Sequence, residues 1–575
     1  MKHLYLGNEA VARGLYEAGV TVVSSYPGTP STEITEYAAT YDEINAEWAP
    51  NEKVSMEVAI GAAIGGARAF SAMKHVGLNV AADPLFTVSY TGVNGGLVFA
   101  VADDPGMHSS QNEQDSRHYA IGAKIPMLEP CDSKECIEYT KLAYELSEGY
   151  DTPVLIRLTT RISHSRSLVE LSERQDRPLK KYEKDFKKYV MMPSSARPKH
   201  EMVEERTEKL REYAENSGIN KIIKGSGRIG IISAGNAYTY AREAMGDEAS
   251  YLKLGMINPL PIELIKQFAA TVDKIYVIEE LDPIIEDHCK ANGIDVIGKK
   301  IFPLTGEYSQ SLVRERICGT KPESIDFGED IPVRPPVMCC GCSHRGLFAA
   351  IKKLGVFVSG DIGCYTLAAL PPLTTMDTCV CMGASVSALH GYNLARGKDA
   401  SKKAVAVLGD STFVHSGITG LINVMYNKTD SKVIVLDNHT TGMTGGQDNP
   451  MSGNTLKQGP APKIDIEMMA RSIGITNIVI VDPYDLTSTY ETIKAELNKD
   501  GPSLIVARRP CMLAGRVKPN PALSIDKDAC KKCGACLVIG CPAISKGKDK
   551  SMSIDQSLCV GCGVCAHTCK FGAIV

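Results

Sequence analysis

The chain has 575 residues, and its 63 basic and 67 acidic side chains leave a net charge of −4 at neutral pH. This length predicts roughly three to five domains, and the balanced charge excludes the global basic field that attracts nucleic acids or anionic membrane surfaces. The sequence has no uncharged apolar run near the ~18 residues of a membrane span, and its start lacks the apolar core of a signal peptide. We therefore expect a cytoplasmic protein with no nucleic-acid or membrane partner.

The first third of the chain alternates apolar runs with amphipathic segments, which predicts an α/β domain with a mostly parallel sheet. We expect helices at 9–18 and 56–72 and strands at 20–25, 79–82, 96–102 and 153–158. The helix at 56–72 is rich in Ala and Gly, so it suits close packing against another backbone. The strand at 20–25 leads into the turn Tyr26-Pro-Gly-Thr-Pro-Ser31.

Charged and polar residues dominate from about 180 to 227, which indicates a linker and a surface helix whose charges face solvent. A second α/β unit follows, with strands expected at 229–233, 274–278 and 294–297. Its Glu279-Glu280 pair fits helix capping or an interdomain contact better than acid–base catalysis. A proline-containing stretch at 332–336 marks the next boundary, and a third α/β domain runs from there to about 521.

Polar side chains follow two apolar runs of the third domain, at 404–408 and 432–436, which we expect to be buried parallel strands. Asp410 follows the first strand and Asn438 follows the second. Carboxylate and amide oxygens at neighbouring strand ends suit Mg²⁺, which commonly keeps diphosphate oxygens as further ligands. Ordinary turns and helix caps use the same residue types, so these residues alone leave both interpretations open.

The tail carries eight of the 19 cysteines in two runs with ferredoxin-like spacing. In such runs three cysteines hold one [4Fe–4S] cluster, and the fourth ligates the other cluster. The spacing thus predicts one cluster on Cys530, Cys533, Cys536 and Cys569 and a second on Cys541, Cys559, Cys562 and Cys565. The first run has one extra residue before its fourth cysteine, and the second lacks the usual proline after it. Structural zinc is the alternative, although zinc sites rarely use two interlocked four-cysteine runs.

Four further cysteines fall at expected loop positions of the third domain: Cys339, Cys342, Cys364 and Cys511. Any one of them could be an inert core residue, because buried cysteine is common as a small apolar side chain. Four together at loop positions favour a ligand role.

Jointly, these motifs resemble the 2-oxoacid:ferredoxin oxidoreductases, and the resemblance covers nearly the whole chain with the domain order of a large subunit. It implies a multidomain thiamine-diphosphate-binding α/β fold with a C-terminal two-cluster ferredoxin module. The implied domains are a pyrimidine-binding-type thiamine domain at 1–190, a linker and transketolase C-terminal-like domain at 191–330, a diphosphate- and Mg-binding thiamine domain at 331–521 and the ferredoxin domain at 522–575.

The resemblance also implies cofactor residues. Gly409, Asp410 and Ser411, together with Asp437-Asn438, match the thiamine-diphosphate signature, although a second Asn commonly stands at the position of Asp437. Asp410, Asn438 and the backbone carbonyl of Thr440 would then hold Mg²⁺. The cysteines Cys339, Cys342, Cys364 and Cys511 match a third, proximal [4Fe–4S] cluster beside the thiamine, with the neighbouring Cys340 as a departure from the motif.

Other positions match residues around the reacting groups. Glu57 matches the catalytic glutamate that hydrogen-bonds the aminopyrimidine ring, and Met382-Gly383 resembles the loop that bends the cofactor, with helix-start packing as the alternative for Met382 and Gly383. Thr29 matches a residue near the substrate carboxylate. Arg117 is a candidate for binding the carboxylate or coenzyme A, because a guanidinium suits bidentate recognition.

For Arg117 the alternative is a structural ion pair with Asp115 or Asp104.

The implied activity is oxidative decarboxylation of an aryl 2-oxoacid such as indolepyruvate, with coenzyme A taking the acyl group and ferredoxin taking the electrons. A small (beta) subunit is expected to complete the active site, in a heterotetramer of two large and two small subunits. Two alternatives stay open: a non-oxidative thiamine decarboxylase with structural clusters, and an electron-transfer subunit of another oxidoreductase. The sequence does not choose among aryl 2-oxoacids, nor does it say whether one chain or two form the thiamine site.

Overall fold

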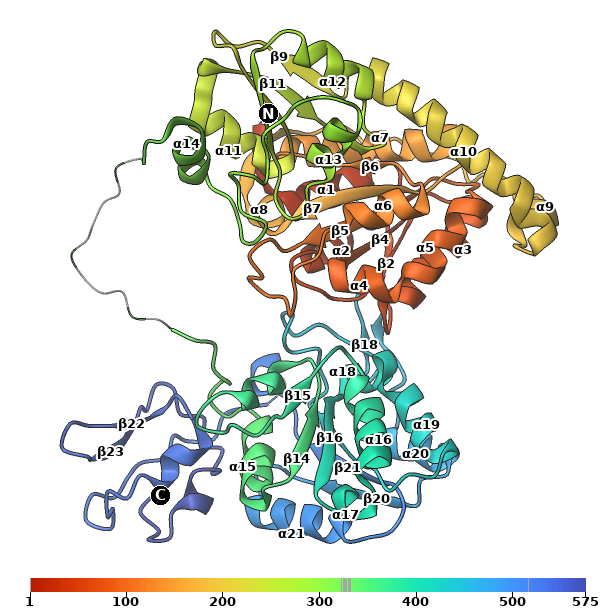
Figure 1. The fold of residues 1–575 in the computed structure, drawn as a ribbon. Helices are drawn as coiled ribbons and strands as arrows, with labels where there is room; N and C mark the ends of the chain where they lie inside the picture. Colours follow the sequence, from red (N-terminus) through yellow and green to blue (C-terminus); the bar gives the residue numbers. More distant parts are fainter. Residues whose placement is uncertain (1, 322, 324–327, 329–331, 333, 516) are drawn as a thin grey trace. The chain divides into compact units, whose positions relative to one another are not determined.

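The computed structural model describes every residue except 1, 322, 324–327, 329–331, 333 and 516. The chain folds into two compact units, Met1–Glu329 and Asp330–Val575, and both are α/β (Figure 1). The predicted boundary between residues 330 and 331 lies outside the described residues. No helix in the described part of the chain is long and apolar enough to cross a membrane.

A seven-stranded sheet forms the centre of the first unit, in the order β12-β6-β7-β5-β4-β2-β3. Its strands are β2 (Val22–Ser25), β3 (Asn45–Trp48), β4 (Ala69–Lys74), β5 (Leu97–Asp103), β6 (Met127–Leu128), β7 (Val154–Thr159) and β12 (Met256–Asn258). Neighbouring strands are parallel except for β12 and β6. The strands β4, β5 and β7 are buried along their whole length, which explains why they are continuous apolar runs in the sequence.

Helices of the first 150 residues pack on this sheet or on one another. They are α1 (Gly7–Glu17), α2 (Thr32–Ala38), α3 (Glu52–Ile64), α4 (His75–Val80), α5 (Ala82–Thr91), α6 (Arg117–Ala123) and α7 (Ser133–Tyr150). The strand β1 (Lys2–Leu6) pairs antiparallel with β8 (Arg166–Glu170), which follows the short helix α8 (Thr160–His164).

A smaller four-stranded sheet completes the first unit, in the order β13-β10-β11-β9. Its strands are β9 (Lys221–Ile223), β10 (Ile229–Ala234), β11 (Ala249–Leu254) and β13 (Lys274–Ile278), with helices α11 (Gly235–Met245), α12 (Ile262–Ala269), α13 (Ile284–Ala291) and α14 (Gln310–Cys318). The strand β12 of this segment extends the large sheet, and one apolar core joins Leu155 to Leu254 and Ile257. The segments expected as separate domains at 1–190 and 191–330 are therefore parts of one compact unit.

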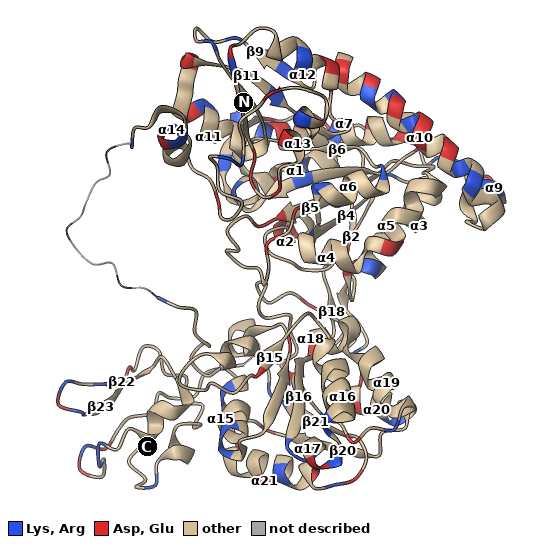
Figure 2. Cartoon of the chain, in the orientation of Figure 1, with Lys and Arg blue, Asp and Glu red and all other residues tan. Residues whose placement is uncertain are grey.

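The charged stretch after residue 180 contains helices α9 (Phe186–Tyr189) and α10 (Pro193–Asn216). In Figure 2 the ribbon of α10 is coloured as acidic and basic residues along its length. Its few buried residues include Val203, Leu210 and Ala214, a spacing that puts one narrow stripe against the unit. The expectation of a surface helix with solvent-facing charges is confirmed.

Three predicted elements are wrong. The helix expected at 56–72 is α3, which ends at Ile64 because two glycines follow, and Gly66 adopts a φ of +98°. Residues 69–74 form strand β4, whereas residues 79–82, expected as a strand, end α4 and begin α5. Residues 294–297 contribute an isolated bridge from Ile297 to Tyr276. Short apolar runs do not distinguish a buried helix from a strand, which accounts for these errors.

The second unit is built on a parallel sheet in the order β15-β14-β16-β17-β21-β20. Its strands are β14 (Phe357–Gly360), β15 (Thr378–Cys379), β16 (Ala404–Gly409), β17 (Lys432–Asp437), β20 (Asn477–Val481) and β21 (Ser503–Arg508). The main helices are α15 (His344–Leu354), α16 (Ala384–Arg396), α19 (Ile418–Tyr426), α20 (Ile466–Ile473) and α21 (Leu486–Leu497). Two apolar cores, one including Val405 and Val407 and the other Ala404 and Ala406, use alternate residues of β16, as expected for a strand buried on both faces.

The cysteine-rich tail belongs to this second unit. It contains the hairpin β22 (Ile544–Lys546) and β23 (Met552–Ile554), and a bridge from Ile525 to Ile574 closes it. Its small apolar core includes Tyr484 of the α/β part, so the tail packs directly on the domain that precedes it.

Candidate functional site

Two neighbouring strands of the second unit carry the predicted magnesium residues at their carboxyl ends. The strands β16 and β17 are parallel, with Gly409 opposite Leu436, so Asp410 and Asn438 leave the sheet at one edge. Asp410 is 1% exposed, and its carboxylate accepts hydrogen bonds from the backbone N–H groups of Ser411 (2.6 Å) and His439 (2.7 Å). The Asp410 carboxylate therefore ties the two strand ends together.

More side chains that could bind a metal ion lie at this edge than the sequence predicted. Ligand atoms of Asp410, Asp437 and His439 all lie within 4.8 Å of one another. Burial, followed by repulsion from Asp437, raises the pKa of Asp410 to about 7. Burial also acts to raise the pKa of Asp437, but hydrogen bonds from His439 and Arg508 bring it below its usual value. A hard divalent cation would offset the charge buried at Asp410, so the residues present fit Mg²⁺.

The loop after β17 holds the remaining predicted diphosphate and magnesium residues. Asn438 Oδ1 accepts a hydrogen bond from the N–H of Thr440 at 3.3 Å. The Ser411 hydroxyl accepts one from the Thr441 hydroxyl at 3.0 Å, and Thr441 forms a bridge with Gln447 that closes the loop. The structure thus brings together all five predicted residues of this set: Gly409, Asp410, Ser411, Asn438 and Thr440.

The turn before α16 requires its glycine. Gly383 adopts a φ of +81°, and a Cβ at this position would lie 2.2 Å from Ser416 Oγ. Ser416 also donates to the carbonyl of Met382 at 2.9 Å, and the buried Asp361 accepts from the N–H groups of Gly383 (2.9 Å) and Ser385 (3.0 Å). These contacts account for the turn as helix-start packing. Contact of Met382 with a cofactor stays a prediction.

The four predicted proximal cysteines lie in the second unit, and electrostatic effects link their thiols. Burial raises the pKa of Cys364 to about 11, and Cys511 and Cys339 add to this shift. Burial likewise raises the pKa of Cys342 to about 12, with contributions from Cys364 and Cys339. Cys364 is therefore within electrostatic reach of Cys511, Cys339 and Cys342.

This cysteine set also borders the predicted thiamine residues. A Cβ on Gly442 would lie 3.4 Å from Cys364 Sγ, and the N–H of Cys511 donates to the carbonyl of Asn438 at 3.0 Å. Both contacts lie within the second unit.

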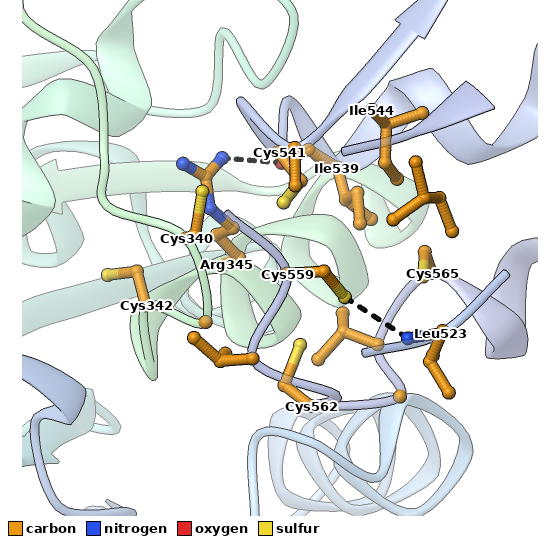
Figure 3. Close-up of a pocket in the computed structure, with 16 residues that line it drawn as sticks. Cys340, Cys342, Arg345, Leu523, Ile539, Cys541, Ile544, Cys559, Cys562 and Cys565 are labelled. Carbon is orange, nitrogen blue, oxygen red and sulfur yellow. Dashed lines mark hydrogen bonds between the residues drawn. The ribbon is translucent and has the colours of Figure 1, made fainter. Parts of the chain in front are cut away.

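Two cavities of the second unit are lined by the tail cysteines. One is lined by Cys530, Cys533, Cys536 and Cys569, and the other, drawn in Figure 3, by Cys541, Cys559, Cys562 and Cys565. These are the two sets predicted from the spacing, with the fourth cysteine of each run at the other cavity. The N–H groups of Leu523 and Ala573 donate to Sγ of Cys559 (3.4 Å) and Cys569 (3.3 Å), the kind of hydrogen bond that tunes a cluster thiolate. Each cavity contains one predicted set of four thiols, which fits a [4Fe–4S] cluster, and Cys340 and Cys342 also line the second cavity.

Glu57, the residue predicted to contact the aminopyrimidine ring, lies on the exposed side of α3. Its side chain is 46% exposed and pairs with Lys53 one turn earlier. Glu52 on the same helix is 5% exposed, and its Oε1 lies against Gly77, 2.7 Å from where a Cβ would be. A glutamate that assists proton transfer in a cofactor pocket needs shielding from water, which Glu52 has and Glu57 lacks.

The sequence contained a signal for Glu52. It shares the buried stripe of α3 with Met56, Ala59 and Ala63, at the spacing of one helical face. Glu57 falls outside this stripe.

Arg117 is enclosed by protein groups in the first unit. It is 2% exposed and donates to the carboxylates of Asp115 (2.6 Å) and Glu279 (2.5 Å) and to the carbonyls of Glu280 (3.0 Å) and Asp282 (2.8 Å). Glu279 also accepts from two N–H groups at the start of α13, so it caps that helix as expected. The geometry favours the structural ion pair with Asp115 over a substrate role for Arg117.

The turn that contains Thr29 has a different cation beside it. Lys74, at the end of β4, is 8% exposed, and its Nζ donates to the Ser109 carbonyl at 2.6 Å. A Cβ on Gly28 would lie 3.2 Å from the Lys74 Cβ. Burial lowers the pKa of Lys74 to about 8, and Asp104 acts in the opposite direction. No motif marked Lys74 in the sequence, and Thr29 stays a predicted substrate residue.

Three segments of the chain match models of known protein families. Residues 13–218 match the thiamine diphosphate-binding domain of pyruvate flavodoxin/ferredoxin oxidoreductase. Residues 361–507 match the C-terminal TPP-binding domain of thiamine pyrophosphate enzymes, and residues 552–575 match a 4Fe-4S binding domain. These matches support thiamine diphosphate and iron–sulfur clusters as the cofactors.

Curated relatives match over nearly the whole chain. Indolepyruvate oxidoreductase subunit IorA of Pyrococcus horikoshii is 40% identical over 628 residues, covering 100% of this chain and 96% of the relative. The subunit of the same name from Archaeoglobus fulgidus is 39% identical, and the match covers 94% of this chain and 92% of the relative. That from Methanothermobacter thermautotrophicus is also 39% identical, and the match covers 100% of this chain and 97% of the relative. The chain therefore belongs to the IorA family of indolepyruvate oxidoreductase subunits, within the thiamine-dependent 2-oxoacid:ferredoxin oxidoreductases.

Proposed function

We propose that this chain is the large subunit of an enzyme that oxidatively decarboxylates aryl 2-oxoacids, indolepyruvate among them, to aryl-acetyl-CoA and CO₂ while reducing ferredoxin. The observation that carries this proposal is the contact between the loop after β17, here called the thiamine loop, and the cysteine set. Gly442 of this loop lies beside Cys364, and the Asn438 carbonyl accepts a hydrogen bond from the N–H of Cys511. A non-oxidative decarboxylase has no need of cluster ligands at this position. The arrangement favours an oxidoreductase in which electrons pass from the cofactor to a cluster.

Thiamine diphosphate is proposed to bind through Mg²⁺, with Asp410, Asn438 and the Thr440 carbonyl as the protein ligands and Gly409 and Ser411 at the diphosphate. When bound, the cofactor supplies the electron sink that decarboxylation of a 2-oxoacid needs. The residues of this chain orient the reactants and balance their charge. Met382, on the turn fixed by Gly383, is proposed to contact the cofactor, and Thr29 the substrate carboxylate.

Electrons are proposed to leave singly through three [4Fe–4S] clusters. The first would be held by Cys339, Cys342, Cys364 and Cys511, and the others by the two tail sets. Ferredoxin would take the electrons from the tail, because the tail cavities lie in the same compact unit as the proximal cysteines.

We also propose that Glu52, rather than Glu57, is the glutamate that hydrogen-bonds the aminopyrimidine ring. Glu52→Gln is expected to lower the rate of 2-oxoacid oxidation by about 10²–10⁴-fold, the usual size of a general acid–base contribution. Bound thiamine diphosphate should be largely kept, because the diphosphate residues are elsewhere. Glu57→Gln on the same helix is the matched control and should retain activity. An inactive Glu57→Gln variant together with an active Glu52→Gln variant would show that Glu57 is the catalytic glutamate, as predicted from the sequence.

The enzyme is proposed to work as a heterotetramer of two large and two small subunits. The test mixes both subunits with an aryl 2-oxoacid, coenzyme A and a viologen dye. Dye reduction that depends on the 2-oxoacid and coenzyme A is expected. Formation of aryl aldehyde without dye reduction would identify a non-oxidative decarboxylase. A protein that neither binds thiamine diphosphate nor turns over the 2-oxoacid would be an electron-transfer subunit.

A further inference from the structure

A buried guanidinium surrounded by backbone carbonyls lies where the tail packs on the α/β part of the second unit. Arg345 is in the first turn of α15 and is 4% exposed. Its N–H groups donate to backbone carbonyls: Nε to that of Cys339 (3.2 Å), Nη1 to those of Ile539 (2.9 Å) and Gly540, and Nη2 to that of Met338. Among the described residues, no carboxylate forms an ion pair with it. Carbonyls satisfy its donors but leave its charge unbalanced, and an unbalanced buried charge is unfavourable.

Arg345 contacts both of the cysteine-bearing segments that meet here. Cys339 begins the Cys339–Cys342 loop, and Gly540 directly precedes Cys541 of the tail. Figure 3 shows Arg345 and Cys340 at the same cavity as the tail cysteines, whose set there is Cys541, Cys559, Cys562 and Cys565. The guanidinium therefore lines the cavity of the tail cysteines and at the same time holds the Cys339–Cys342 loop through a backbone carbonyl.

The helix itself adds to the positive charge at this point. The N-terminal end of a helix carries partial positive charge, so a cation in the first turn of α15 is unfavourable unless an anion offsets it. A [4Fe–4S] cluster with four thiolate ligands is a net anion, and its reduction adds one more negative charge, so nearby charge sets its potential. An anion of this kind in the neighbouring cavity would offset the charge of Arg345.

We propose that Arg345 is the counter-charge of the cluster held by Cys541, Cys559, Cys562 and Cys565, and that it raises the reduction potential of this cluster. Its hydrogen bonds to Cys339 and Gly540 also fix the tail against the Cys339–Cys342 loop, which makes it a positioning residue of the electron path. The inference rests on the tail clusters and not on the identity of the substrate.

The test is an EPR-monitored redox titration of the purified holoenzyme with dithionite and no substrate. Arg345→Met, which removes the charge, should move the midpoint potential of one [4Fe–4S] signal to more negative values by about 59 mV or more, a tenfold change in a one-electron equilibrium. The signal of the other tail cluster serves as an internal reference and should move less. The same titration in a Cys364→Ser background, where the proximal cluster is removed, should still show the shift if it belongs to a tail cluster. Arg345→Gln, which keeps N–H donors without the charge, should behave like Arg345→Met. Arg345→Lys keeps the charge and should stay near the wild-type potential.

Lys353→Met is the matched control, since Lys353 is an exposed cation of the same helix whose charge is screened by solvent. It should leave every midpoint unchanged. Iron per chain is measured for each variant. Retention of iron in Arg345→Lys with loss from both neutral variants would also support the proposal, because the charge would then be needed to hold the cluster. An unshifted midpoint in an iron-complete neutral variant, or equal shifts or equal iron loss in all three Arg345 variants, would overturn it.

Discussion

Purified Asp410→Ala protein is expected to contain no thiamine diphosphate and to have lost all 2-oxoacid oxidation. The Asp410 carboxylate joins the ends of β16 and β17 and is the only carboxylate in the predicted Mg²⁺ ligand set. Loss of an outer partner of a metal ligand weakens metal binding by about 10–100-fold, and loss of the ligand itself should exceed that. Cofactor content of the purified protein is the measurement, and unchanged iron content shows that the clusters remain intact.

Two further variants test whether cofactor loss comes from removal of the Asp410 charge. Asp410→Asn should also lose Mg²⁺ and thiamine diphosphate. It removes the repulsion from Asp437 but keeps only one of the two oxygens that accept from the N–H groups of Ser411 and His439. Asp500→Ala, at an exposed carboxylate of the same unit, should keep the cofactor. Wild-type cofactor content in Asp410→Ala would remove the proposed magnesium site.

Cys364→Ser is expected to lower the iron content from about twelve to about eight atoms per chain, because one of three four-iron clusters would lose a ligand. Cys364 is the proximal cysteine beside Gly442 of the thiamine loop, so dye reduction by the 2-oxoacid should be lost as well. Reduction of the remaining clusters by dithionite should persist, and iron analysis with EPR measures both.

Cys381→Ser is the control for this experiment, because Cys381 is an exposed cysteine outside the three predicted sets. It should keep the wild-type iron content and activity. About eight iron atoms in the wild-type chain itself would show that the third cluster does not form.

The sheet framework of the second unit follows from the sequence because its strands are buried on both faces. The apolar runs at 404–408 and 432–436 match β16 and β17 closely, and the polar residues after them meet at one edge because the strands are parallel. The first unit was harder to predict. The small residues between 52 and 72 suit both a helix and a buried strand, and the switch from α3 to β4 depends on the backbone conformation at Gly66.

The cysteine sets were easier to predict than the charged residues of the site. Ligand spacing along the chain restricts which thiols can meet, and both tail cavities contain the predicted sets. The roles of Glu57 and Arg117 depended on which side chains are buried and on what surrounds them, and this information is three-dimensional. Arg117 meets Glu279 from a segment more than 150 residues away, a contact that no local pattern indicates.

Electrons released from a 2-oxoacid are expected to enter the clusters of this chain. Holoenzyme with its small subunit is mixed anaerobically with an aryl 2-oxoacid, without dye or ferredoxin, and samples are frozen at intervals for EPR. Signals of reduced [4Fe–4S] clusters should appear as the 2-oxoacid is consumed, and they should be absent from Asp410→Ala. Release of CO₂ and aryl aldehyde while the clusters stay oxidised would contradict the claim.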